Sequence, residues 1–183
     1  MYRPVRGLVQ ERSRAWEQVA TRDPPLRRTA TRLVHTARPG RMERAMERQA
    51  KGDFEVRRTP QEALDAGDGV QVAHVRFDKR FHGPLDATSV VHMLAVGTDV
   101  PGSAAYVAIE RIAGTLDGRE GSFLAQHGGT MDRGQPTLSV TVVPDSGTGA
   151  LAGLRGRMAI DIVDGAHSYT FDYQLDDPLP QGD

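Results

Sequence analysis

From residue 52 onward, apolar and polar side chains alternate along short segments that are separated by turn residues. A period of two is typical of strands with one buried face. The clearest segment is 168–175, in which Tyr169, Phe171, Tyr173 and Leu175 alternate with polar residues. In 71–81, Lys79 alone interrupts the apolar face. The other predicted strands are 52–58, 88–96, 105–116, 119–127, 137–143 and 157–163, and a single helical turn is expected at 60–66.

The connections between these segments are short and rich in Gly, Pro and Asp. Short connections require antiparallel neighbours. A single buried face favours closure of the sheet on itself, because closure removes exposed edges. The pattern therefore predicts an all-β fold, a single eight-stranded antiparallel barrel, with a two-sheet sandwich as the alternative. The interior of an eight-stranded barrel is either filled by side chains or holds one small ligand.

The Asp-Gly pair at 117–118 predicts the register of one hairpin. It suits a two-residue type I′ turn, in which both central residues have positive φ. In that register Glu110 lies opposite Ala125, and Ala108 lies opposite His127. Cross-strand partners share a face. The face that carries the aromatic residues, and that we place inside the barrel, then contains Tyr106, Ala108, Glu110, Ile112, Phe123, Ala125 and His127.

The charge distribution separates the first 50 residues from the rest of the chain. Residues 1–50 carry 12 arginines and 5 acidic residues, a net charge of +7, whereas residues 51–183 carry a net charge of −8. We expect an Arg-rich, disordered extension at 1–48, a barrel at 49–178 and a tail at 179–183. Met42 and Met46 stand just before this change, so the natural start could be either, with 1–41 as translated upstream sequence. Arginines and aromatics do not interleave here as a stacking surface for nucleic acid requires.

Several classes of function are disfavoured by what the sequence lacks. It has no cysteine, which excludes disulfides and thiolate metal sites. The six histidines form no HxH or HxxxH pair, so no metal site is expected. The glycines at 147–153 are spaced GxGxxxG and precede no helical pattern, so no nucleotide cofactor is expected. Without an apolar run of about 18 residues or a signal peptide, we predict a cytoplasmic protein that does not bind membranes or nucleic acid.

Glu110 and His127 are the candidate chemical groups, since they are diagonal neighbours on an otherwise apolar face. A buried carboxylate is costly unless it is paired. The two residues suit a general acid/base pair or a polar anchor for a ligand. They equally suit a structural hydrogen bond inside the barrel, completed by Tyr106, Tyr169 or Tyr173.

Three blocks of sequence resemble one bacterial family. They are IERIAGTLDGREGSFLAQHGGT at 109–130, VPDSGTGALAGLRG at 143–156 and HSYTFDYQL at 167–175. Their order and spacing are similar to those of domain-of-unknown-function family 3224, over about residues 49–177. The resemblance implies an allene-oxide-cyclase-like eight-stranded barrel and no assigned activity. Allene oxide cyclases and dirigent-like proteins steer cyclisation or coupling of apolar substrates, but a shared fold does not fix function.

Three functions are consistent with these observations. The first is a barrel that binds a small, largely apolar molecule without a cofactor. The second is an isomerase or cyclase that uses Glu110 and His127. The third is a self-filled barrel that acts as a homo-oligomer. The residues expected to line the ligand site are Tyr106, Glu110, Phe123, His127, Tyr169, Phe171 and Tyr173, beside Phe77 and Phe81.

Overall fold

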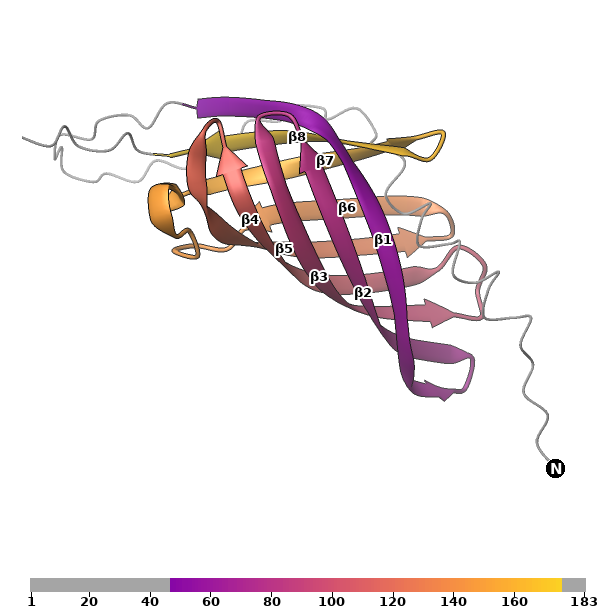
Figure 1. The fold of residues 1–183 in the computed structure, drawn as a ribbon. Coiled ribbons are helices and arrows are strands. Elements are labelled where there is room, and N and C mark those ends of the chain that lie inside the picture. The colour runs from indigo at the N-terminus through magenta and orange to yellow at the C-terminus, as the bar shows by residue number, and fades with distance from the viewer. Residues whose placement is uncertain (1–46, 176–183) are drawn as a thin grey trace, which may run out of the picture.

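A computed structural model describes residues 47–175 as a closed barrel of eight antiparallel strands joined in chain order (Figure 1). The first strand pairs with the last, so the predicted barrel is confirmed and the sandwich is excluded. The predicted extension, 1–48, lies outside the described residues except for 47 and 48, which begin the first strand, and the predicted tail, 179–183, lies outside them entirely. The strands are β1 (Glu47–Gly67), β2 (Val70–His82), β3 (Leu85–Thr98), β4 (Ala104–Leu116), β5 (Arg119–Asp132), β6 (Gln135–Val142), β7 (Arg155–Val163) and β8 (Ala166–Gln174).

Four hairpins close with the same two-residue turn. In each turn both central residues have positive φ, the signature of a type I′ turn. At Asp117 and Gly118 the φ angles are 48° and 76°, as the sequence predicted, and the expected register of β4 and β5 is confirmed. The same pair of positive φ angles occurs in the turns at Asp68-Gly69, Arg133-Gly134 and Asp164-Gly165.

Strand β1 is longer than the sequence indicated. The helical turn predicted at 60–66 is wrong, because the strand continues to Gly67. Its pairing with β2 shifts register between Pro60 and Ala63 and again between Ala63 and Asp65. The ladder with β8 ends at Phe54, so this part of β1 pairs with β2 alone. Proline, which has no N–H to donate, is tolerated on such an edge and at bulges.

One end of the barrel is closed by the connection between β6 and β7. This segment contains a short 3-10 helix, η1 (Gly149–Leu151), and it buries Leu151 and Leu154 completely. It lies against β5, since a Cβ on Gly121 would come within 2.1 Å of the Thr148 carbonyl oxygen. The sequence predicted a short connection rich in Gly, Pro and Asp here, but not that its leucines plug the barrel. Beneath the plug lies an apolar cluster that includes Phe81, Leu85, Leu116, Phe123, Tyr169, Phe171 and Tyr173.

The opposite end, which we call the mouth, is bordered by the hairpin tips at 68–69, 99–103, 133–134 and 164–165. A second, smaller apolar cluster lies inside it, formed by small and medium side chains. Phe77 and Tyr106 pack against this cluster and are only partly buried. The interior is therefore less enclosed at the mouth than at the plugged end. The buried members of this mouth cluster are Val75, Val91, Met93, Ala95 and Ala108.

The seam between β6 and β7 is the least paired part of the wall. These strands share a single register pair, Thr141 with Arg157. The β5–β6 and β7–β8 ladders on either side have eight and nine pairs.

Within residues 47–175, no helix is long and apolar enough to cross a membrane.

Candidate functional site

Four consecutive strands each contribute one polar side chain to the middle of the barrel interior. Glu110 of β4 is completely buried. Its Oε2 atom accepts a hydrogen bond from Lys79 Nζ of β2 at 3.0 Å and lies 2.8 Å from His127 Nε2 of β5. Its Oε1 atom accepts a short hydrogen bond from Ser89 Oγ of β3. We call these residues, Lys79, Ser89, Glu110 and His127, the Glu110 cluster.

Strand register explains why these four side chains meet. Lys79 and Ser89 are direct cross-strand partners on β2 and β3. Ser89 in turn pairs with Ile112, two residues from Glu110, and Glu110 is two residues from Ala108, the partner of His127. Diagonal neighbours on one face of a sheet are within reach of long side chains. The pairing of β2 to β5 therefore builds the cluster without any unusual backbone geometry.

The Glu110 carboxyl is ionised at neutral pH. Burial alone raises its pKa, but the Lys79 charge, His127 and the Ser89 hydroxyl outweigh burial and lower the pKa from 4.5 to about 2. The His127 contact has the length of an ion pair, although its N–H direction is not aligned for a regular hydrogen bond. A buried charge of this kind persists only where opposite charges and donors surround it.

Like Ser89, Lys79 is a member of the cluster that sequence reasoning missed. Its side chain is 9% exposed, and its Nζ lies 5.0 Å from the centre of the Phe54 ring and 5.7 Å from that of Phe81. An ammonium group over aromatic faces is attracted to their electron-rich surfaces. The signal was present as the one break in the apolar face of 71–81.

The predicted site residues do not all gather around Glu110. The structure brings Glu110 and His127 together, as expected. Phe123, Phe171 and Tyr173 instead stack near the plug, with ring centres 5.8 Å and 5.3 Å apart. The hydrogen bonds that complete the environment of Glu110 come from Lys79 and Ser89.

The hydroxyls of Tyr169 and Tyr173 are engaged at the closed end. Tyr169 donates to the His82 carbonyl and accepts from the Leu85 N–H, both at 3.1 Å, and so ties down the β2–β3 connection. Tyr173 donates to the carboxylate of Asp117 in the β4–β5 turn. Burial and this carboxylate raise the pKa of Tyr173 to about 12. Both tyrosines thus hold turns in place.

Tyr106 lies at the mouth, where it and Phe77 pack against the mouth cluster. A Cβ on Gly129, its cross-strand partner, would come within 2.3 Å of the Tyr106 ring, so the ring packs directly over that glycine. Burial and the negative charge of Glu110 raise the pKa of Tyr106 to about 12. Its hydroxyl is therefore neutral at physiological pH.

Comparisons with known proteins agree with this barrel. The family profile described as "Protein of unknown function (DUF3224)" matches residues 50–173. The chain belongs to the DUF3224 family. It is 44% identical to a DUF3224 protein of unknown function from Shewanella oneidensis MR-1, whose crystal structure has a TM-score of 0.68. The match covers 72% of this chain and all of that one, and no curated protein matches.

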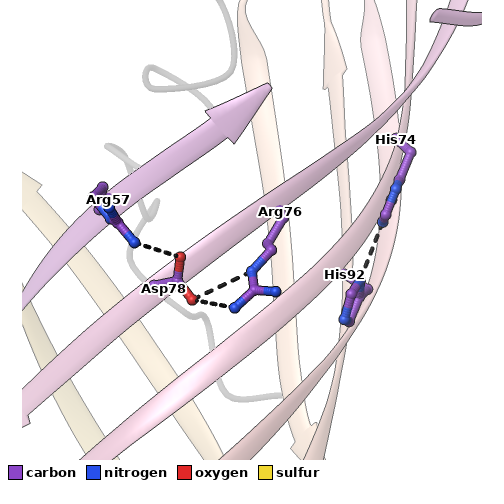
Figure 2. A network of polar contacts seen from close by, with 5 residues as sticks. All are labelled: Arg57, His74, Arg76, Asp78 and His92. Carbon is purple, nitrogen blue, oxygen red and sulfur yellow. Dashed lines mark hydrogen bonds and ion pairs between the residues drawn. The ribbon is translucent and has the colours of Figure 1, made fainter. Parts of the chain in front are cut away.

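The outer face of this DUF3224 barrel carries a separate polar network (Figure 2). Asp78 bridges Arg57 and Arg76, with N···O distances of 3.4 Å and 2.7 Å. In the same view, His74 Nε2 lies 3.2 Å from His92 Nδ1. These side chains are solvent-accessible, and they alternate with the inward-facing ones. The network borders a surface recess of about 400 Å³, lined by Arg57, Asp78, Lys79, Thr88, Ser89, Val90, Arg111 and Ala113.

Proposed function

We propose that the barrel binds a small, largely apolar molecule inside, between the mouth cluster and the Glu110 cluster. One observation carries the proposal: an ionised carboxylate, an ammonium group and an imidazole are held in the middle of an apolar interior. Apolar residues of similar volume often stabilise a fold as well as a buried ion pair does. Buried charges with perturbed pKa values are concentrated at functional sites, which favours a binding role.

The two ends of the interior differ in a way that supports entry from the mouth. Large side chains and the leucine plug fill the closed end. Near the mouth, by contrast, Ala95 and Ala108 have small side chains that fill little of the interior. Phe77 and Tyr106 remain partly exposed there. Ligand sites are typically apolar clefts with a few placed polar groups. In the proposed site, the Glu110 cluster supplies those polar groups at the inner end.

An isomerase or cyclase with Glu110 as the base has less support. A general base works best when its pKa is near the operating pH. The pKa of Glu110 is about 2, which makes it a weak base at neutral pH. Kinship with allene oxide cyclases is an analogy of fold and adds no residue-level argument. The geometry therefore favours binding over proton transfer by Glu110.

Binding is tested with the neutral apolar fluorophore N-phenyl-1-naphthylamine, alongside native mass spectrometry of the purified protein. Ala95→Phe fills the mouth cluster, whereas Ala159→Phe adds the same bulk at an exposed position of β7. We expect the wild type and Ala159→Phe to bind the fluorophore and folded Ala95→Phe to lose it. Equal binding by all three proteins, with no co-purified molecule, would contradict the proposal and support a self-filled barrel.

A further inference from the structure

The carboxylate of Glu110 is surrounded by the protein's own donors. Ser89 donates to Oε1, Lys79 donates to Oε2, and His127 Nε2 also faces Oε2 at 2.8 Å. Glu110 is completely buried, so no side of it is exposed. A ligand amine would have to displace one of these groups to reach it. Glu110 is thus the centre that orients the other groups rather than the group that meets a ligand.

Lys79 differs because it retains donor capacity. An ammonium group has three N–H donors and no acceptor. Among the side chains that the structure describes, its Nζ donates to one oxygen, that of Glu110, and it also lies over the rings of Phe54 and Phe81. With 9% of the side chain exposed, little water reaches the remaining N–H groups. Leaving a nearly buried charged donor without an acceptor is unfavourable, so an oxygen supplied from the mouth would stabilise it.

We infer that the molecule held in the barrel ends in a carbonyl or carboxylate oxygen and that Lys79 donates a hydrogen bond to this oxygen. This inference rests on the proposed function. The apolar remainder of the molecule lies against the mouth cluster, toward Met93 and Ala95. Tyr106, neutral and partly buried, packs against the same mouth cluster.

Ligands that share an apolar chain but differ in the charge of the end group distinguish hydrogen bonding by Lys79 from general apolar binding. A carboxylate oxygen forms a charge-assisted hydrogen bond with Lys79, and a ketone oxygen forms a weaker one. An amine of the same length brings a second positive charge beside Lys79, with no acceptor to offer. Decanoate, 2-decanone and decylamine therefore form a matched series in which the apolar chain hardly changes.

The experiment measures displacement of N-phenyl-1-naphthylamine by these three compounds. We expect the better of the two oxygen-ended compounds to bind about tenfold or more tightly than decylamine, the factor given by one hydrogen bond to a charged group. Lys79→Met with Glu110→Gln removes both charges together, so no unpaired ion is left to unfold the barrel. In this double variant the preference should fall to within about threefold. Lys51→Met is the matched control, because Lys51 is the only other lysine and is exposed on β1.

A second measurement uses the wild-type protein only. Peptide mass spectrometry after amine acetylation should show that decanoate or 2-decanone slows the reaction of Lys79 and leaves that of Lys51 unchanged. Equal affinity for decylamine, or a preference that persists in the double variant, overturns the assignment to Lys79 while apolar binding stands. Failure of the wild type to bind the fluorophore overturns both the inference and the proposed function.

Discussion

Replacing Glu110 by glutamine tests whether the buried charges stabilise one another. The substitution keeps the shape of the side chain and removes its charge. The carbonyl of the new amide still accepts from Lys79, but the ammonium group then has no counter-charge inside the barrel. Removing one partner of a buried ion pair is destabilising because it leaves the other charge uncompensated.

The size of the loss follows from the pKa of Glu110. Lowering a pKa from 4.5 to about 2 corresponds to about 3 kcal/mol of interaction with the charged form, at 1.36 kcal/mol for each unit. This agrees with the ~3–5 kcal/mol typical of breaking a buried pair. Unfolding entropy of about 2.1 cal/mol/K per residue over residues 47–175 is about 0.27 kcal/mol/K, which converts the loss to a drop in Tm of about 10 °C.

Thermal unfolding followed by circular dichroism measures this change. Glu120→Gln is the control, because Glu120 lies on the neighbouring strand with an exposed side chain. Its Tm should stay within about 2 °C of that of the wild type, as for surface substitutions in general. If Glu110→Gln also stays within that range, the buried carboxylate provides no net pairing energy and the electrostatic argument is wrong.

Two further predictions concern the pH dependence of stability and the packing of Tyr106. The pKa of Glu110 is lower in the folded state, so its contribution is complete above about pH 4.5 and disappears as the pH falls toward 2. Urea unfolding at about pH 5 and pH 3 should therefore show about 2 kcal/mol more loss for the wild type than for Glu110→Gln. At the mouth, Gly129→Ala places a Cβ 2.3 Å from the Tyr106 ring and should cost about 1–3 kcal/mol. Gly128→Ala, which meets only Ser139 Oγ at 3.5 Å, is its control, and equal Tm values for the two variants would contradict the packing of Tyr106.

The sequence predicted the part of the site that depends on one local turn. The Asp117-Gly118 pair has a single favoured geometry, and this placed Glu110 and His127 on one face. Lys79 was visible as an exception to alternation, but its meeting with Glu110 depends on the pairing of β2, β3 and β4. Ser89 lies in a segment that is apolar on both faces, so alternation could not orient it.

Elements governed by tertiary contacts were predicted less well. The first strand was predicted to end at residue 58, yet β1 continues to Gly67, because two register shifts and a second edge without a partner strand accommodate Pro60. The leucines of the β6–β7 connection carry no periodic signal, and they are buried only because the loop folds over the end of the barrel. Tyr169 and Tyr173 were expected at a ligand, but their hydroxyls contact turns that are distant in sequence.

The seam between β6 and β7 has a consequence for motion. Local opening requires breaking few interactions where a ladder is short, so it costs less than global unfolding. With one register pair, Thr141 with Arg157, these two strands can separate while the longer ladders on either side stay intact. Amide protons along their facing edges should therefore exchange with solvent by a low-energy route, whereas those of β3 and β4 exchange only when the whole barrel unfolds.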